Sequence, residues 1–228
     1  MGCDEFNRST LPELADQPHT ILGSTQKEWM LNHLVTATTR YKVLGNQTLM
    51  SRLGLEFRDL DIPLNLDAWD GYRHERDELM AELTIAKVDN FIVLTGDMHS
   101  HIAANVKLDY SDGNGSNTDN FVGVEFMTPA ISSATLNEIL AAQANKDADI
   151  TINVSSMAAA AVRSTNAHIR YANLTTQGYS TVLFNPEYAL WESFVVDKNV
   201  PNANTKLQVA RYKKRVDRPW LTSQQFTF

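Results

Sequence analysis

The chain has 228 residues, of which 43% are hydrophobic and 21% are charged, a composition typical of a globular protein with one sizeable domain. Its formal net charge of −7 disfavours a nucleic-acid-binding surface, which requires clustered Lys and Arg. The single cysteine, Cys3, excludes an intramolecular disulfide and a cysteine-rich zinc site.

The sequence contains no run of about 18 apolar residues that could cross a membrane, and nothing at its start resembles a signal peptide. The chain as it begins here is therefore expected in the cytoplasm, provided that Met1 is the natural start. One basic cluster, between Arg211 and Arg215, is predicted to be a solvated strand edge or tail, because Asp217 lies beside it.

Three segments are predicted: a polar start over residues 1–20, one domain over residues 21–197 and a polar C-terminal tail over residues 198–228. The first helix is predicted to begin at Thr25, which has capping-box spacing to Glu28. Apolar residues at helical spacing give it a face toward the core, made of Trp29, Met30, Leu31, Leu34 and Val35.

The next elements alternate between strand and helix. Residues 41–46 are predicted to form a short strand, and residues 50–66, which lack periodicity, a long loop. A second helix is predicted within residues 67–87, with its charged side chains on one wet face. Residues 91–94 are an unbroken apolar run, typical of a strand that is buried on both faces. A helix followed by such a strand indicates a layered α/β fold.

Further strands are predicted toward the C-terminus. Residues 102–110 alternate apolar and polar side chains, which predicts a strand with one wet face, and residues 121–133 predict a strand that runs into a turn. Residues 134–165 are rich in Ala and are predicted to be helical. Residues 179–197 predict two strands joined at Asn185-Pro186, because Asn-Pro favours a turn.

The stretch FIVLTGDMHSH, Phe91 to His101, carries the strongest chemical signal. Ligands of layered α/β folds bind beyond the carboxyl ends of strands, and Gly96 permits a sharp turn and a close approach there. Asp97 offers an oxygen donor and His99 a nitrogen donor, and in an extended chain both side chains point to the same side. A carboxylate with an imidazole suits zinc, iron or manganese. His101 follows two residues after His99, so in an extended chain its side chain would point to that same side.

A polar turn is the alternative interpretation of this stretch. Asp97 would then cap backbone N–H groups and His99 would be an ordinary exposed side chain, and the residues alone leave both interpretations open. The sequence has no Gly-x-Ser-x-Gly elbow, no Walker-type phosphate loop and no His-Glu-x-x-His helix. Nucleophilic serine chemistry is therefore not predicted.

Six segments occur in a fixed order over about residues 20–196: HTILGSTQKEWM, YKVLGNQ, LDAWDGYRHERDELM, FIVLTGDMHSHIAANV, VGVEFMTPAISS and NAHIRYANLTTQGYSTVLFNPE. Together they resemble the C-terminal half of the PhoD-like alkaline phosphatases, a branch of the calcineurin-like metallophosphoesterases. The resemblance implies an α/β fold: the C-terminal half of a four-layer α/β/β/α sandwich with a mixed sheet, incomplete in this chain.

The resemblance also implies a function. It predicts metal-dependent hydrolysis of small phosphate esters, a phosphomonoesterase activity to which phosphodiesters are a further expected substrate class. Iron with calcium is the implied metal set, and other divalent metals are alternatives. Asp97 and His99 match the late metal ligands of the family and are the implied catalytic and metal-binding residues. The candidates for lining the substrate pocket are His101, Tyr72, Glu125 and His168.

Several matched residues have a structural interpretation that we weigh equally with the functional one. Trp69 and Arg76, in the Trp-Asp-Gly-Tyr motif and just after it, are expected to belong to the scaffold. The remaining residues of this kind are Asp70, Gly71, Tyr72, Glu125, Ser132, Ser133, His168 and Tyr171.

One departure from the family is large. The family's N-terminal half supplies early cysteine, aspartate, tyrosine and asparagine ligands and an arginine that meets phosphate, and Cys3 does not match that cysteine. The chain is therefore expected to be a fragment of an exported parent protein. Two ligands are fewer than the three of a typical catalytic site, so a non-catalytic fragment that acts only as a structural or binding partner is the alternative function. An uncovered sheet edge predicts self-association.

Overall fold

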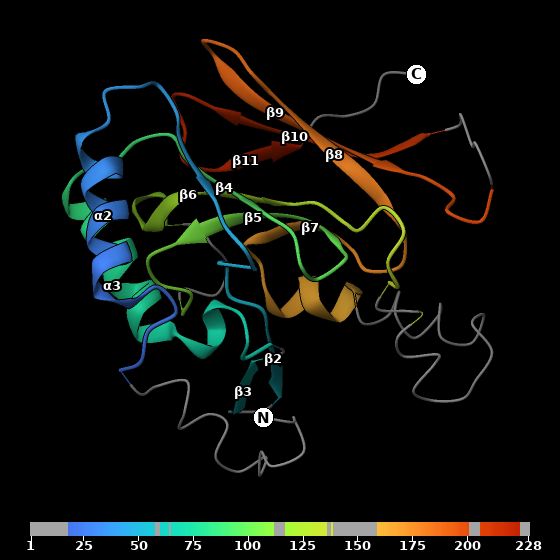
Figure 1. Cartoon of the computed structure of the whole chain (residues 1–228), viewed down its shortest axis with the longest axis horizontal. Helices are drawn as coiled ribbons and strands as arrows, with labels where there is room; N and C mark the ends of the chain where they lie inside the picture. Colours follow the sequence, from blue (N-terminus) through green and yellow to red (C-terminus); the bar gives the residue numbers. More distant parts are fainter. Residues whose placement is uncertain are drawn as a thin grey trace.

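A computed structural model describes residues 18–57, 60–63, 65–111, 117–135, 138, 159–200 and 206–223 (Figure 1). Cys3 and most of the stretch predicted to be helical, residues 134–165, lie outside them. Within that stretch, residues 159–165 form a helix. None of the described helices has the length and apolar character needed to cross a bilayer.

A mixed five-stranded sheet lies at the centre of the described chain (Figure 1). In spatial order its strands are β1 (Lys42–Gly45), β4 (Phe91–Thr95), β6 (Phe121–Met127), β5 (His101–Lys107) and β7 (Ile169–Asn173). β1, β4 and β6 are parallel, whereas β5 is antiparallel to both of its neighbours. The first four strands of this order confirm the strands predicted at residues 41–46, 91–94, 121–133 and 102–110.

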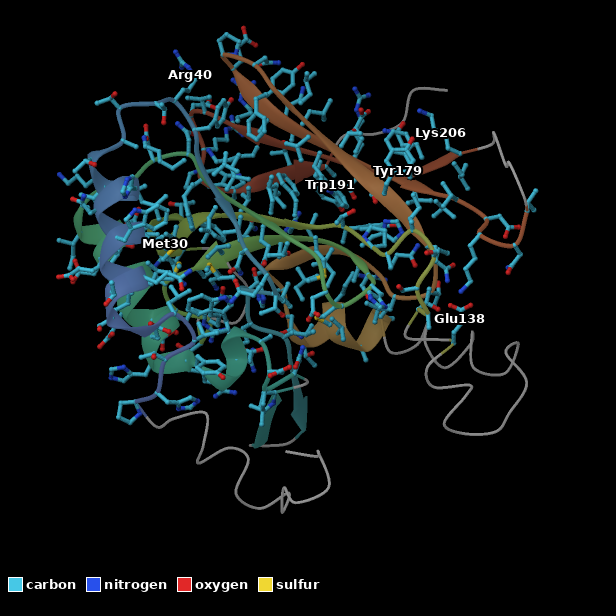
Figure 2. The ribbon with its side chains drawn as sticks, viewed as in Figure 1. Met30, Arg40, Glu138, Tyr179, Trp191 and Lys206 are labelled. Atoms are coloured by element: carbon cyan, nitrogen blue, oxygen red, sulfur yellow. The ribbon has the colours of Figure 1, made fainter. Side chains whose placement is uncertain are left out.

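A second, antiparallel sheet packs on one face of the mixed sheet (Figure 1). Its strands, in spatial order, are β11 (Leu221–Ser223), β10 (Leu207–Arg215), β9 (Tyr188–Val195) and β8 (Gly178–Phe184). Trp191 of β9 points into the space between the sheets and stacks on Phe126 of β6, with ring centroids 5.5 Å apart (Figure 2). The predicted turn at Asn185-Pro186 is confirmed, since it joins β8 to β9.

The opposite face of the mixed sheet is covered by helices and by an irregular segment. Helices α2 (Gly23–Thr36) and α3 (Arg73–Ile85) pack over β4, where Phe91 and Val93 are buried against them. The 3₁₀ turn η2 (Trp69–Gly71) precedes α3, and the short antiparallel pair β2 (Gly54–Phe57) and β3 (Leu60–Pro63) interrupts the predicted loop at residues 50–66. The described chain thus forms three layers: helices, mixed sheet and antiparallel sheet.

Helix α2 differs from its prediction at both its start and its face. It begins at Gly23 without a side-chain cap, so the predicted capping box at Thr25 is wrong. Two backbone N–H groups at the helix entry, those of Ile21 and Leu22, instead donate to the Glu75 carboxylate of α3, at 2.7 and 3.2 Å. Met30 and Leu34 are buried, whereas Trp29 is 62% exposed and Val35 is also exposed. Only one narrow stripe of the apolar face meets the core.

One prediction about exposure is wrong for a whole strand, and another is wrong for a single residue, Lys214. All seven residues of β5 are buried, because it lies inside both the sheet and the layer stack, and so the strand predicted with one wet face has none. The predicted C-terminal tail supplies β10 and β11. Within its basic cluster, Lys214 is only 1% exposed and donates to Asn90 Oδ1 at 2.7 Å, and burial lowers its pKa to about 8.

Candidate functional site

The three parallel strands end at one edge of the mixed sheet. β1 ends at Gly45, β4 at Thr95 and β6 at Met127. Two backbone hydrogen bonds just past these ends keep the three segments side by side. They run from Asn46 N to Leu94 O and from Thr128 N to Thr95 O, both at 2.9 Å. This carboxyl edge is where ligands of open α/β sheets bind.

Asp97 and His99 follow β4 at this edge in a tight, strained turn. Both residues adopt left-handed backbone angles, φ 73° and φ 49°, which residues other than Gly rarely adopt. Met98 N donates to Gly96 O across the turn, at 3.0 Å. The expectation of an extended Asp-x-His segment is therefore wrong, and the sharp turn lies at Asp97 and His99, whereas Gly96 has no left-handed φ. Such strain is concentrated at functional sites.

His99 has a fixed tautomer. Its Nδ1 lies 2.7 Å from the carbonyl oxygen of Ala134, and since a carbonyl can only accept, Nδ1 carries the proton. The lone pair is therefore on Nε2. Histidines that bind metals almost always donate their other ring N–H to a carbonyl or carboxylate in this way. Ala134 lies in the segment that follows β6, so the turn after one parallel strand orients the imidazole after another.

Asp97 is exposed, and among the described residues one side-chain hydrogen bond holds its carboxylate. The Thr48 hydroxyl donates to Oδ2 of Asp97 at 3.2 Å, and this bond uses one of the four lone-pair sites of the carboxylate. Thr48 comes from the segment after β1. Three segments that are far apart in sequence thus converge at the edge. Sequence reasoning missed Thr48 and Ala134, although the rule that parallel strands end at one edge could have drawn attention to both.

The donor set at the edge fits a metal ion that accepts oxygen and nitrogen ligands, such as iron, zinc or manganese. Asp97 offers an exposed carboxylate and His99 an unprotonated Nε2. Within the described residues, no group of three or more His, Cys, Asp and Glu side chains is placed to hold an ion. The edge therefore provides a partial ligand set, short of the three protein ligands of a typical catalytic zinc site.

The Trp-Asp-Gly-Tyr segment lies beneath residues 46–54, which run from the end of β1 to the first residue of β2 and which we name the strap. The Arg76 guanidinium pairs with Asp70 at 2.6 Å, and both side chains are buried. Asp70 Oδ2 also accepts the backbone N–H of Leu53, at 2.6 Å, in the strap. Trp69 is fully buried beside them, whereas the Tyr72 ring packs against His19, with centroids 4.7 Å apart, at the start of α3.

Glu125 is not a surface group of the edge. It lies in the middle of β6 and is fully buried, and its two carboxylate oxygens accept the backbone N–H groups of Met50 and Ser51 at 2.8 and 2.7 Å. Burial raises the pKa of Glu125, and these two N–H groups oppose that shift. Its contacts are therefore with the strap.

His101 lies between the two sheets, away from solvent. Its Nδ1 is hydrogen-bonded to the Ser193 hydroxyl of β9, and its Nε2 lies 3.2 Å from the Thr176 hydroxyl. Burial lowers the pKa of His101 to about 4, so the ring is neutral at pH 7. An even spacing in sequence places two side chains on one side only while the backbone is extended. The turn at residues 97–99 interrupts the extended backbone, so His101 does not lie beside His99.

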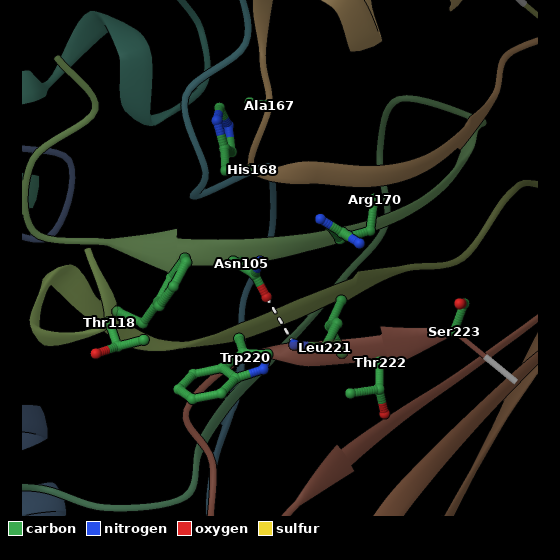
Figure 3. A pocket seen from close by; sticks show the side chains of 10 residues that line it. Asn105, Thr118, Ala167, His168, Arg170, Trp220, Leu221, Thr222 and Ser223 are labelled. Carbon is green, nitrogen blue, oxygen red and sulfur yellow. Dashed lines mark hydrogen bonds between the residues drawn. The ribbon is translucent and has the colours of Figure 1, made fainter. Parts of the chain in front are cut away.

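His168 lies toward the opposite edge of the sheet, at the start of β7. Its Nε2 donates to Arg52 O at 2.8 Å, and burial lowers its pKa to about 3. It borders a cavity of about 440 Å³ with Arg170 and Trp220 (Figure 3). Asn105, near the far end of β5, also lines this cavity and accepts Leu221 N at 2.8 Å. The structure therefore separates His168 from Asp97 and His99.

The remaining residues that match the family motifs lie in two different places. Ser132 and Ser133 are exposed in the segment just before Ala134, whereas Tyr171 packs between the sheets near Trp191. Of the candidate metal ligands and pocket residues, Asp97 and His99 lie on the turn that follows β4 at the carboxyl edge.

Comparison with known proteins identifies relatives with this architecture. Residues 4–192 match a family model described as PhoD-like phosphatase. Alkaline phosphatase D of Bacillus subtilis (strain 168) is 28% identical over 131 residues, which are 57% of this chain and 21% of that protein. A solved structure described as "Structure of PhoD" shares the fold with a TM-score of 0.71 and 20% identity, over 96% of this chain and 38% of that one.

These matches confirm the α/β class with its mixed sheet, and they show that the chain spans about a fifth of the length of the curated relative. Because the family model covers most of its length, the chain belongs to the PhoD-like phosphatase family.

Proposed function

We propose that this chain contributes the Asp97–His99 part of a metal site that hydrolyses phosphate esters. The observation that carries the proposal is the orientation of His99: Nδ1–H is bound to Ala134 O, which leaves the Nε2 lone pair for a metal at the carboxyl edge. The family match and the likeness to alkaline phosphatase D support phosphate esters as the substrate class.

The chain's own residues would act by holding and orienting. Asp97 would bind through its exposed carboxylate, with Thr48 holding Oδ2, and His99 through Nε2. A bound ion would supply Lewis-acid polarisation of a phosphoryl oxygen. The strained turn fixes both donors before any ligand arrives, which reduces the ordering cost on binding. Iron with calcium remains the predicted metal set, and other divalent ions belong in the same test.

The test is hydrolysis of p-nitrophenyl phosphate after loading with iron and calcium, manganese or zinc, by this chain and by the longest product of its gene. Asp97→Ala and His99→Ala are expected to lower the rate by at least about 100-fold, since losing even an outer-shell partner of a ligand costs 10- to 100-fold. His33→Ala is the matched control, because His33 Nδ1 also binds a carbonyl at 2.7 Å, but on the exposed side of α2. Equal rates in all three variants would overturn the proposal.

A second candidate function is a non-catalytic structural or binding role. It is favoured by one observation: the described residues hold no cluster of three or more ligating side chains. Under this alternative the purified, folded chain binds metal weakly and hydrolyses no phosphate ester with any of the metals. Metal-dependent hydrolysis by the chain alone, lost in Asp97→Ala, would exclude it.

A further inference from the structure

The strap, residues 46–54, crosses the helix-side face of the mixed sheet from one edge to the other. It begins at the carboxyl edge, where Thr48 meets Asp97. It passes Glu125 in the middle of β6, and it reaches His168 near the opposite edge through the carbonyl of Arg52. Side chains of distant segments therefore hold the strap along its whole length.

Between Met50 and Leu53, the hydrogen bonds from distant carboxylates and from His168 are directed at the backbone of the strap. Glu125 accepts two consecutive N–H groups, Met50 and Ser51, one on each carboxylate oxygen. Asp70 accepts the N–H of Leu53 at 2.6 Å. Side chains that bind backbone groups fix the path of the chain whatever side chains the strap itself carries.

We propose that Glu125 and Thr48 are positioning residues for the metal site: Glu125 fixes the strap, and the strap places the Thr48 hydroxyl against Asp97. This inference rests on the proposed function of Asp97 and His99. It gives Glu125 a role in site geometry in place of direct contact with substrate.

The position of Thr48 is determined from three sides. The Thr48 side chain is 5% exposed, so its hydroxyl has little freedom to leave Asp97. Its carbonyl accepts Asn46 Nδ2 at 2.6 Å, and Asn46 Oδ1 in turn lies 3.4 Å from Trp69 Nε1. Two residues further along the strap, the Met50 N–H donates to the Glu125 carboxylate. A shift of the strap would therefore move the donor that orients the metal-binding carboxylate.

Burial of a carboxylate is a costly way to fill a core position. Glu125 is 0% exposed, between Val124 and Phe126, which are also buried but point to the other sheet. Well-packed apolar residues in place of buried charged groups are often neutral or stabilising, so stability alone does not account for a carboxylate here. A requirement to hold two N–H groups at one place accounts for it.

The first measurement is Co²⁺ titration of the full chain, followed by the visible absorption of the bound ion, which reports both affinity and ligand geometry. Thr48→Val keeps the shape of the side chain and removes the donor, and Glu125→Gln keeps the shape and replaces one acceptor oxygen with a donor. Both are expected to weaken Co²⁺ binding about 10- to 100-fold, the range for partners of metal ligands. Thr84→Val and Glu192→Gln are the controls, since Thr84 lies on α3, bonded to Met80 O, and Glu192 is on the second sheet, bonded to Gln208.

The second measurement is independent of metal. Hydrogen exchange of the metal-free chain is followed by mass spectrometry for peptides covering residues 46–54 and 96–101. Glu125→Gln is expected to accelerate exchange at least threefold in both peptides and to leave peptides of β9 unchanged. If Glu125→Gln does not fold, Thr48→Val is judged by the same peptides, with acceleration expected in residues 96–101.

The outcomes separate this inference from the proposed function. If Asp97→Ala abolishes Co²⁺ binding while Thr48→Val and Glu125→Gln bind like wild type, the positioning role is overturned and the metal site stands. If Asp97→Ala leaves Co²⁺ binding unchanged, the proposed function fails and the positioning role, which rests on it, is overturned with it. If Asp97→Ala abolishes Co²⁺ binding, unchanged exchange in residues 96–101 of Glu125→Gln overturns the positioning role alone, and coupled acceleration supports it.

Discussion

The carboxyl edge and the anchors of the strap contain the same types of side chain in opposite environments. At the edge, Asp97 is exposed, and Asp97 and His99 both adopt left-handed backbone angles. Beneath the strap, Asp70 and Glu125 are buried, and backbone N–H groups bind their carboxylates.

Residues that belong to the same family motifs therefore fall into two groups. A carboxylate or imidazole with an unused lone pair at an exposed, strained position can accept a ligand. A buried carboxylate or imidazole whose lone pairs are bonded to backbone groups instead fixes the path of the backbone. The two regions should therefore differ in their contributions to stability and to metal binding.

The largest effect is expected for Arg76→Ala, which leaves the buried carboxylate of Asp70 without its cation. Breaking one partner of a buried pair typically costs about 3–5 kcal/mol of unfolding free energy. Urea denaturation measures the loss, and Arg215→Ala is the control, because its pair with Asp217 is exposed and is expected to contribute little. A loss no larger than that of the control would remove Arg76 from the anchors.

A pH effect of similar size is expected from the two buried histidines. The folded chain keeps His101 and His168 neutral, with pKa values of about 4 and about 3, whereas the unfolded chain protonates them near pH 6.5. Since the unfolded state then binds more protons, stability falls as pH falls from about 6.5 toward 4, by about 1.4 kcal/mol per pH unit for each histidine.

Urea unfolding at pH 7, 6 and 5 measures that slope, and His168→Gln should remove about half of it. The exposed His33→Gln is the control and should leave it unchanged. Glu125, whose raised pKa acts in the opposite sense, is present in every variant and cancels from the comparison. A slope that His168→Gln does not change would show that this ring is accessible to protons in the folded chain.

A matched pair of glycines distinguishes the regions by packing. A Cβ at Gly71 would lie 1.9 Å from the carbonyl oxygen of Leu66, so Gly71→Ala requires a backbone shift and is expected to cost about 1–3 kcal/mol. A Cβ at Gly96 meets nothing within 4 Å, so Gly96→Ala is expected to leave stability unchanged or to raise it by up to about 1 kcal/mol. Thermal unfolding of both variants checks the difference, and equal losses would contradict it.

The smallest change in stability is expected at the edge itself. His99→Gly relieves a left-handed φ of 49° but loses the bond to Ala134 O, so the free energy of unfolding should change by no more than about 1 kcal/mol. If the proposed function is correct, metal affinity should nevertheless fall sharply, because the proposed Nε2 ligand is gone. Calorimetric metal titration beside urea denaturation measures both, and a large loss of stability with intact metal binding would reverse the roles assigned to the two regions.

Local sequence patterns were enough to predict helices α2 and α3 and the strands β1, β4, β5, β6, β8 and β9, and to place Asp97 and His99 just after β4. The apolar run at residues 91–94 identifies a buried strand, and a polar Asp-x-His loop after such a strand lies at a carboxyl edge in any layered α/β fold. The family motifs also predicted the α/β class and the mixed sheet, which the solved relative confirms. These features depend on local periodicity and on residue order, which a single sequence contains.

Which side chains meet depends on contacts between segments that are far apart in the sequence. Parity along the chain predicts a shared side only while the backbone is extended, and the left-handed turn at Asp97 and His99 breaks that condition, so His101 lies between the sheets. Thr48 and Ala134 join the site because strand register brings three parallel ends together. The burial of Glu125 depends on the strap above it, and β10 is a strand because β9 and β11 pair with it. Long-range pairing sets all of these, and no local pattern encodes it.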